Sequence, residues 1–379
     1  MQHPDKLPKV GVLGGGQLGR MMIQSSMNLN VYIKSLDPDP NAPCASLANE
    51  FHNGSLTDYD TVLAFGQDVD VVTVEIENVN VDALAELEKQ GKKVFPQPHI
   101  LKIIQDKRLQ KEFYRENGIP TSEYFLIDRK EDLPKHKDFL PAVMKIGKGG
   151  YDGRGVEIIR SEADFEKGFE APSLLEDLVN IEKEISIIIA RNEKGATTVF
   201  PPVELVYTPQ NMVDYLLGPA NISNEILEKA NTIATDLINK MGMVGLLAVE
   251  MFVTPEGDVL VNEVAPRTHN SGHQTIEANL TSQFEQHLRA ILNLPLGSTK
   301  MRSASAMVNL LGEEGHTGEA VYEGLHEVLS KEGVFIHLYG KLMTKPHRKM
   351  GHVTIVDEDM DKLKEKIEIV KKTLKVKAL

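Results

Sequence analysis

Residues 244 to 273 contain two apolar, β-branched runs separated by the short polar segment Thr-Pro-Glu-Gly-Asp. Such runs around a turn with Pro and Gly predict a β-hairpin. If Thr254 pairs with Val259, the register places Glu250 directly opposite Glu263. Facing like charges destabilise a sheet unless a cation lies between them, and Mg²⁺ held by carboxylates and nucleotide phosphates is a common arrangement. The alternative is an amphipathic hairpin whose glutamates face water.

The segment after the second of these strands is unusually polar. Within ten residues of Glu263 it contains Arg267, His269, Asn270, Ser271 and His273, interrupted by Pro266 and Gly272. Polar side chains at this density directly after a strand indicate a site rather than ordinary surface.

The N-terminal part of the chain predicts a doubly wound α/β domain. A strand, the Gly-rich turn at residues 14 to 20, a helix and a second strand ending at Asp37 form its first βα unit. This spacing satisfies the dinucleotide fingerprint, so a nicotinamide-dependent dehydrogenase is a competing interpretation. In a third strand, residues 69 to 76, alternation places Glu75 and Glu77 on one face at the carboxyl end, where ligands gather. A helix over residues 82–89 and a fourth strand over residues 93–96 follow.

A second Gly-rich segment joins two later strands. Residues 147 to 155 contain five glycines in nine positions, which predicts a loop whose backbone N–H groups can fold over phosphates. Lys145 precedes it among apolar neighbours, where a charge is costly unless it is paired or meets a ligand. The alternative is a mobile hairpin with a snorkelling lysine. The flanking expectations are a helix over residues 100–117 and strands over residues 142–146 and 156–159.

From about residue 174 the expected elements no longer alternate as βα units, which argues against a plain dehydrogenase. Lys341, His347, Arg348 and Lys349 form a basic cluster between the last two expected strands. It is either a solvated turn or a grip for a phosphate. The expected strands are residues 174–179, 182–191, 197–200, 306–311, 334–339 and 352–356, with helices over residues 223–241, 282–292 and 359–372.

Composition narrows the class of protein. The 379 residues are enough for two or three domains, and a net charge of −13 argues against a nucleic-acid partner. The single cysteine, Cys44, suits a reducing compartment. No signal-like apolar segment and no apolar run of about 18 residues are found, so we expect a cytoplasmic protein without a membrane partner.

Three motifs, at residues 14–20, 149–155 and 262–273, occur in this order. With them the whole chain resembles the ATP-grasp superfamily and, within it, the N5-carboxyaminoimidazole ribonucleotide synthetase family. The resemblance implies a mixed α/β and α+β fold of three parts. These are a doubly wound N-terminal domain (residues 1–100), a central ATP-grasp domain that clamps nucleotide between two antiparallel sheets (residues 101–297) and a small β-rich C-terminal domain (residues 298–379).

The resemblance also implies roles for individual residues. Glu250 and Glu263 would hold Mg²⁺, with Mn²⁺ as an alternative. ATP would be bound by Lys107, Lys145, Gly149, Gly150, Glu176, Leu178, Glu184 and Asn262. Arg267, His269 and Asn270 would hold bicarbonate or carboxyphosphate, and Asp152 and Arg154 would complete the catalytic set. The ribonucleotide would contact Tyr151, Glu75, Lys341 and Arg348. Residues 202 to 207 lack a histidine often found near the nucleotide in this family, and no role is assigned to them.

The implied reaction converts ATP, bicarbonate and aminoimidazole ribonucleotide into the N5-carbamate, ADP and phosphate through carboxyphosphate, in a homodimer. A glycinamide ribonucleotide formyltransferase of the same superfamily is the nearest rival. The Asn-Ser-Gly-His run after Arg267 and the Gly-Gly-Tyr-Asp-Gly loop favour the carboxylase. A dehydrogenase would leave Glu250 and Glu263 without a role, and a non-catalytic protein of this fold would bind ribonucleotide without ATP turnover.

Overall fold

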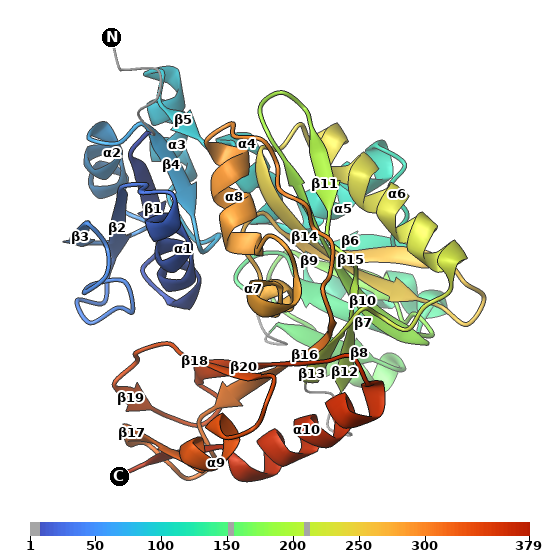
Figure 1. The fold of residues 1–379 in the computed structure, drawn as a ribbon. Coiled ribbons are helices and arrows are strands. Elements are labelled where there is room, and N and C mark those ends of the chain that lie inside the picture. The colour runs from blue at the N-terminus through green and yellow to red at the C-terminus, as the bar shows by residue number, and fades with distance from the viewer. Residues whose placement is uncertain (1–7, 151–154, 208–212) are drawn as a thin grey trace.

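The structure, a computed structural model, describes residues 8–150, 155–207 and 213–379. Its N-terminal part is a five-stranded parallel sheet in the order β3-β2-β1-β4-β5, drawn in blue in Figure 1. The order reverses between β1 and β4, as in a doubly wound fold. The elements are β1 (Val10–Leu13), α1 (Gln17–Asn28), β2 (Ile33–Asp37), β3 (Glu50–Asn53), α2 (Tyr59–Gln67), β4 (Val71–Val74), α3 (Val81–Lys89) and β5 (Lys93–Val94).

Two features of this sheet differ from the sequence prediction. β3 and α2 were not predicted, because β3 is four residues at the sheet edge with only partial burial and no apolar alternation. β4 ends at Val74, so Glu75 and Glu77 lie beyond the strand and its alternation does not apply to them. The prediction that both glutamates share one strand face is therefore wrong.

The predicted helix over residues 100–117 is two helices. α4 (Pro98–Ile104) ends before Gln105, and α5 (Lys107–Glu116) begins after Asp106, whose side chain accepts a hydrogen bond from the Arg108 N–H. An aspartate N-cap satisfies a free amide at the start of a helix, which favours a new start over continuation. Lys107 is consequently the first residue of α5 rather than a mid-helix residue.

The central region contains two antiparallel sheets, as the resemblance implies. The smaller has the order β6-β9-β7-β8, and β15, β14, β10 and β12 lie at one end of the larger, with β11 paired to β10. The elements are β6 (Tyr124–Ile127), η1 (Lys130–Phe139), β7 (Ala142–Ile146), β8 (Val156–Ile159), η2 (Glu162–Lys167), β9 (Ser173–Asp177), β10 (Lys183–Arg191), β11 (Thr197–Val199), β12 (Val203–Tyr207), β13 (Val213–Gly218), α6 (Asn224–Met241), β14 (Gly245–Val253) and β15 (Val259–Ala265).

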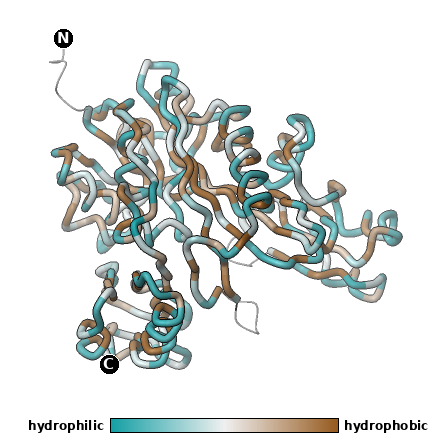
Figure 2. Tube along the Cα trace, turned by 45° about the vertical axis from the view of Figure 1, so that its right-hand side comes forward, coloured by the Kyte–Doolittle hydropathy of each residue, from teal (hydrophilic) through white to brown (hydrophobic). Residues whose placement is uncertain are grey.

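Helix α6 covers the larger sheet and begins as predicted. The Ser223 side chain accepts a hydrogen bond from the Ile226 N–H, and Gly242 closes the helix in the left-handed conformation with φ 63°. Its apolar face packs on β10 and β14 in a buried cluster. Figure 2 shows hydrophobic segments concentrated along these inner strands, with hydrophilic chain at the outer turns.

The β14–β15 hairpin confirms the prediction that Glu250 faces Glu263, but its strand register differs from the predicted one. Glu250 pairs with Glu263, but Val253 rather than Thr254 pairs with Val259, so the connecting loop is one residue longer than predicted. The register shifts between Glu250 and Met251 because Asn262 is an extra residue in β15. A bulge re-aims side chains locally, and this one restores the carboxylates to facing positions.

The larger sheet continues into the C-terminal region. β13 pairs with β16, which continues through β20 to β18, so nine strands including β11 belong to one sheet. The predicted boundary between residues 297 and 298 thus divides a continuous sheet. The elements are η3 (Asn270–Gly272), α7 (Thr275–Ala278), α8 (Gln283–Ile291), β16 (Ala304–Leu311), β17 (Gly318–Glu323), α9 (Leu325–Leu329), β18 (Val334–Leu338), β19 (Met343–Thr344), β20 (Lys349–Asp357), α10 (Met360–Thr373) and β21 (Lys375–Ala378).

Helix α8 connects the N-terminal sheet to the rest of the molecule. Phe284, Leu288 and Ile291 belong to the same buried cluster as residues of β1 and α1. His287 places its Nε2 atom 2.9 Å from the Thr73 hydroxyl of β4. Figure 1 shows α8 standing between the blue sheet and the green and yellow central strands. The carboxyl edge of the parallel sheet is thereby held next to the polar segment that follows β15.

Candidate active site

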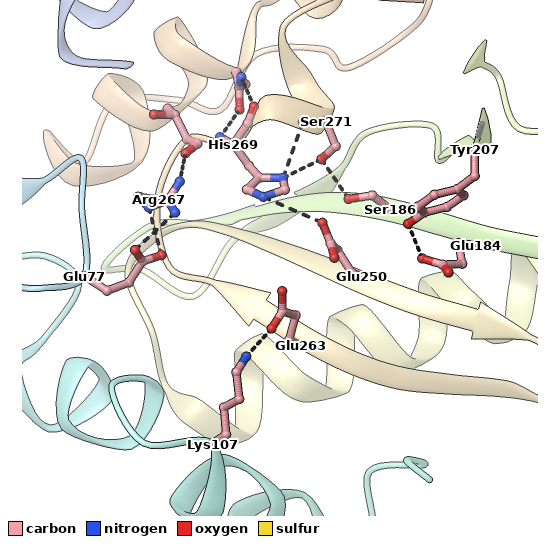
Figure 3. A network of polar contacts seen from close by, with 12 residues as sticks. Glu77, Lys107, Glu184, Ser186, Tyr207, Glu250, Glu263, Arg267, His269 and Ser271 are labelled. Atoms are coloured by element: carbon pink, nitrogen blue, oxygen red, sulfur yellow. Dashed lines mark hydrogen bonds and ion pairs between the residues drawn. The ribbon is translucent and has the colours of Figure 1, made fainter. Parts of the chain in front are cut away.

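The centre of the candidate site is the carboxylate pair on the β14–β15 hairpin. Figure 3 shows Glu250 and Glu263 side by side on facing strands. Burial, together with the charges of Glu263 and Glu184, raises the pKa of Glu250 to about 8. Burial would also raise the pKa of Glu263, but the Lys107 ammonium beside it lowers that pKa overall. The pair therefore carries about one negative charge near neutral pH until a cation is added.

The donor set of this pair fits Mg²⁺. Carboxylate oxygens are hard ligands, and Mg²⁺ is commonly held by one or two of them with phosphates and water. Across the described residues, no group of three or more His, Cys, Asp or Glu is placed to hold a metal. The hairpin would therefore supply only part of the coordination, and nucleotide phosphates would supply more.

Lys107 is placed against this pair by the start of α5. It forms an ion pair with Glu263, toward which Figure 3 shows it extending from below. Burial would lower the pKa of Lys107, but the adjacent Glu263 carboxylate raises it overall, so the lysine is cationic. If a metal ion bound the two carboxylates, it would take over the neutralisation of Glu263, and the Lys107 ammonium could then contact a phosphate.

A second lysine cluster lies beside the hairpin. Lys145 on β7 donates to the Asn262 Oδ1 atom at 2.8 Å and lies 3.3 Å from Glu176 Oε2. Lys111 on α5 lies 3.1 Å from the same Glu176 oxygen. Burial would raise the pKa of Glu176, but Lys145 and Lys111 lower it, so the carboxylate is ionised. Predicted ATP-binding residues Lys145, Glu176 and Asn262 are thus brought together.

His269 is held as a neutral donor. Burial lowers its pKa to about 3, and the charges of Arg267 and Lys349 add to the effect. Its Nδ1 atom accepts a hydrogen bond from the Ser271 N–H at 3.3 Å, so the ring proton resides on Nε2. Nε2 faces Glu250 Oε1 at 3.7 Å, as Figure 3 shows. His269 is therefore arranged to donate a proton in a hydrogen bond rather than to accept one at Nε2.

Arg267 is oriented by a partner from the N-terminal sheet. Its Nε atom lies 2.8 Å from Glu77 Oε1, and one terminal nitrogen donates to Glu77 Oε2 at 3.1 Å. Its other terminal nitrogen donates to the Thr268 carbonyl at 3.0 Å. The hydrogen bond from the terminal nitrogen and the close ion-pair contact at Nε both hold the guanidinium against the same carboxylate and restrict its orientation. The contact between Glu77 and Arg267 thus holds the segment after β4 against the segment after β15.

The other Gly-rich turn is filled by the chain itself. The Gly16 and Gly19 N–H groups donate to Glu75, and the Gly15 N–H donates to Asp37 Oδ2 at 2.7 Å. Burial raises the pKa of Glu75, while these amides favour its charged form. Amides at the start of α1 that would receive a dinucleotide phosphate therefore hold side-chain carboxylates. This arrangement disagrees with the dehydrogenase interpretation.

The basic cluster of the C-terminal region lies partly within reach of this turn. Burial lowers the pKa of Lys341 to about 8, and the charge of Arg348 contributes, while Glu75 opposes the shift. Lys341 donates to the Lys349 carbonyl at 2.7 Å, and Arg348 donates to the Met343 carbonyl at 2.7 Å. The charge of Lys349 also acts on Glu250 and His269. Lys341 and Lys349 of this cluster therefore lie close enough to the site for charge effects with Glu75, Glu250 and His269.

The remaining predicted residues are distributed around this centre. Glu184 on β10 accepts a hydrogen bond from the Tyr207 hydroxyl at 2.5 Å, which gives the unassigned segment at residues 202 to 207 a contact in the site. Gly149 has a φ of 81°, which glycine adopts readily. Gly150 ends the described part of the loop, Leu178 follows β9, and Asn270 begins η3. Tyr151, Asp152 and Arg154 lie outside the described residues.

Comparison with known proteins agrees with this geometry. Family models match in chain order: a ribonucleotide synthetase preATP-grasp domain (residues 7–105), an ATP-grasp domain (residues 112–284) and a phosphoribosylaminoimidazole carboxylase C-terminal domain (residues 305–366). N5-carboxyaminoimidazole ribonucleotide synthase of Bacillus subtilis is 36% identical over 93% of this chain and 92% of its own. The chain belongs to the N5-carboxyaminoimidazole ribonucleotide synthetase family.

Solved structures of this family have the same fold. The Thermotoga maritima synthetase has a TM-score of 0.91 and 44% identity, covering 98% of this chain and 100% of its own. The Aspergillus clavatus synthase in complex with ADP and 5-aminoimidazole ribonucleotide has a TM-score of 0.89 and 32% identity, covering 97% and 98%. The chain spans about two thirds of a longer relative, the chloroplastic phosphoribosylaminoimidazole carboxylase of Vigna aconitifolia, which is 38% identical over 95% of this chain and 66% of its own.

The sequence did not predict several residues that the structure places in the site of this family member. Glu77 was noted only for its strand position, and Lys349 only as part of a basic run, whereas the structure gives each a contact or a charge effect at the centre. Lys111 was not predicted, although it lies one helical turn from Lys107, a spacing that brings two side chains to one face of a helix. Ser186, whose hydroxyl lies 2.7 Å from that of Ser271, and Tyr207, which donates to Glu184, carried no sequence signal.

Proposed function

We propose that this chain carboxylates 5-aminoimidazole ribonucleotide with ATP and bicarbonate, releasing N5-carboxyaminoimidazole ribonucleotide, ADP and phosphate. The observation that carries the proposal is the facing pair of Glu250 and Glu263, flanked by Lys107 and by the Arg267–His269 segment. Membership of the synthetase family supports the same reaction, since a relative of this family was solved with ADP and 5-aminoimidazole ribonucleotide.

The first step is phosphoryl transfer. A bicarbonate oxygen attacks the γ-phosphorus of ATP, a new O–P bond forms, and the bond to the β-phosphate oxygen breaks to release ADP. Such transfers need positioning and charge neutralisation more than covalent chemistry. Lys107 and Lys145 supply positive charge beside the hairpin. Mg²⁺ on Glu250 and Glu263, with Mn²⁺ as an alternative, would neutralise phosphate charge.

The second step transfers the carboxyl group. The amine of the ribonucleotide attacks the carbonyl carbon of carboxyphosphate, or CO₂ released from it, and the C–O bond to phosphate breaks. The amine loses one proton as the carbamate forms, and the departing phosphate accepts it. Arg267 and the Nε2–H of His269 would donate hydrogen bonds to the bicarbonate-derived oxygens, and the contact of Arg267 with Glu77 and the Ser271 N–H bond to His269 Nδ1 support these roles. Neutral His269 holds the carboxyl group and is not the base at Nε2.

Binding roles follow the predicted assignment. Asn270, Asp152 and Arg154 complete the catalytic set, and the ribonucleotide is bound by Tyr151, Glu75, Lys341 and Arg348. Gly149, Gly150, Glu176, Leu178, Glu184 and Asn262 complete the ATP site. The proximity of Lys341 to Arg348 and Glu75 supports one ribonucleotide site between the N-terminal and C-terminal regions.

The setting of the enzyme is part of the same proposal. We expect a cytoplasmic homodimer with the three domains at residues 1–100, 101–297 and 298–379, and with no nucleic-acid partner. In the described parts of the chain, the helices are all too short or too polar to cross a membrane.

The test is ADP release from ATP, Mg²⁺ and bicarbonate, measured with and without aminoimidazole ribonucleotide. Glycinamide ribonucleotide with formate is the control for the rival formyltransferase. The proposal predicts that only the aminoimidazole substrate stimulates ADP release. Stimulation by the control pair would reassign the enzyme, and no stimulation by either would refute both assignments.

A further inference from the structure

Lys111 is a buried cation behind the candidate nucleotide site. It lies one turn beyond Lys107 on α5, and it is only 2% exposed. Its Nζ atom donates to the Ser122 hydroxyl at 3.0 Å and lies 3.1 Å from Glu176 Oε2, and it also donates to the Thr121 hydroxyl. A buried ammonium is costly unless such partners satisfy it.

The carboxylate that Lys111 meets is shared. Glu176 is 3% exposed, and its Oε2 atom receives the Ser122 hydroxyl at 2.8 Å and Lys145 at 3.3 Å, in addition to Lys111. One carboxylate thus faces two lysines, and the group of three carries a net charge of +1. Lys145 is the more accessible of the two lysines, with 14% of its side chain exposed against 3% for Lys111.

Because Glu176 is shared by two lysines, one of them can leave it when a nucleotide binds. If Lys145 turns toward a phosphate, it moves away from Glu176, and a buried carboxylate left without a counter-ion would oppose the movement. Lys111 stays behind, because it is more deeply buried than Lys145 and is also held by the Thr121 and Ser122 hydroxyls. Lys111 then neutralises Glu176, and the positive charge of Lys145 interacts with the ligand.

We propose that Lys111 is a positioning residue that keeps Glu176 neutralised while Lys145 engages the nucleotide. The inference rests on the proposed function only in taking Lys145 as a nucleotide-binding lysine. Without Lys111, Lys145 and Glu176 form a closed ion pair of zero net charge. Nucleotide binding would then have to break that pair.

The experiment measures the affinity of the full-length protein for Mg·ADP by calorimetry. Lys111→Met is expected to weaken binding at least about tenfold, because Lys145 can then reach the nucleotide only by leaving the buried Glu176 carboxylate without a counter-ion. Lys34→Met is the matched control: Lys34 is another lysine with 1% exposure, held near Asp68 and Glu50 in the N-terminal sheet. Its removal is expected to lower thermal stability while leaving Mg·ADP affinity unchanged.

A double-variant cycle separates positioning from general structural damage. In a Glu176→Gln background no carboxylate needs a counter-ion, so the added loss from Lys111→Met is expected to shrink to less than about threefold. The double variant also leaves no unpaired buried charge, so it covers the case in which Lys111→Met alone does not fold. An undiminished loss in that background would overturn the inference, as would a folded Lys111→Met protein with wild-type affinity.

The experiment distinguishes an error in the proposed nucleotide site from an error in the proposed role of Lys111. If the wild-type protein binds no Mg·ADP, the proposed nucleotide site is wrong and the role of Lys111 falls with it. If the wild-type protein binds and Lys111→Met binds equally well, only the role of Lys111 is wrong.

Discussion

Binding of Mg²⁺ with nucleotide should release a proton from Glu250. In the ligand-free protein, burial and the facing Glu263 raise the pKa of Glu250 to about 8. A carboxyl group must lose its proton to ligate a metal. Metal binding near neutral pH is therefore coupled to deprotonation at this one position, and the coupling should disappear in Glu250→Gln.

The size of the effect follows from that pKa. At pH 7 a group with a pKa of about 8 is about nine-tenths protonated, so each binding event should release about 0.9 proton from Glu250. Deprotonation at pH 7 costs about 1.4 kcal/mol per unit of difference between pKa and pH. The affinity of the wild type for Mg·ADP, taken relative to that of Glu250→Gln, should accordingly rise about tenfold between pH 7 and pH 9, where deprotonation of Glu250 is nearly complete.

The assay is calorimetric titration with Mg·ADP in two buffers that differ in ionisation enthalpy, at pH 7 and at pH 9. The nucleotide's own protons cancel when the wild type is compared with Glu250→Gln. The expected difference at pH 7 is about one proton, falling close to zero at pH 9. Equal proton release by the two proteins at pH 7 would refute the argument that the facing carboxylates await a cation.

Four further outcomes are expected. Glu263→Gln should abolish metal-dependent ADP release without a change in the circular dichroism spectrum; near-normal turnover would argue against a metal at the hairpin. Glu77→Gln should lower kcat about tenfold to a hundredfold, because Arg267 loses the anionic partner that orients it, while leaving the KM for ATP within about twofold. Arg348→Ala should raise the KM for the ribonucleotide far more than that for ATP, and equal changes would indicate a structural cluster. Ser223→Ala should lower the free energy of unfolding by about 1 kcal/mol in urea titrations, with turnover unchanged, because α6 loses its N-cap.

The parts of the fold that the sequence predicted are those with strong local patterns. The α6 helix was predicted over residues 223–241, which matches its N-cap at Ser223, and the β14–β15 hairpin was recognised from two apolar runs around a turn. The facing of Glu250 and Glu263 was correct although the turn was misjudged by one residue. The bulge at Asn262 compensated for that error, and a bulge of this kind leaves no pattern in the sequence.

The parts that were missed depend on contacts between distant segments. Glu77 and Arg267 are 190 residues apart, so nothing local indicates that one orients the other. Lys111 reads as an ordinary surface lysine of a charged helix until β9 and the segment before β6 cover it. The break before Lys107 was missed because residues 100 to 117 contain neither an internal Pro nor Gly, and only the side-chain contact of Asp106 starts the new helix.

The most direct test of the proposed reaction follows oxygen from bicarbonate labelled with ¹⁸O. If bicarbonate attacks the γ-phosphorus and the C–O bond of carboxyphosphate then breaks, one bicarbonate oxygen stays on phosphorus. Mass spectrometry of the released phosphate should then show one ¹⁸O atom per turnover, dependent on aminoimidazole ribonucleotide. Unlabelled phosphate released at the same rate as ADP would mean that water attacks ATP directly, and would contradict the carboxyphosphate route.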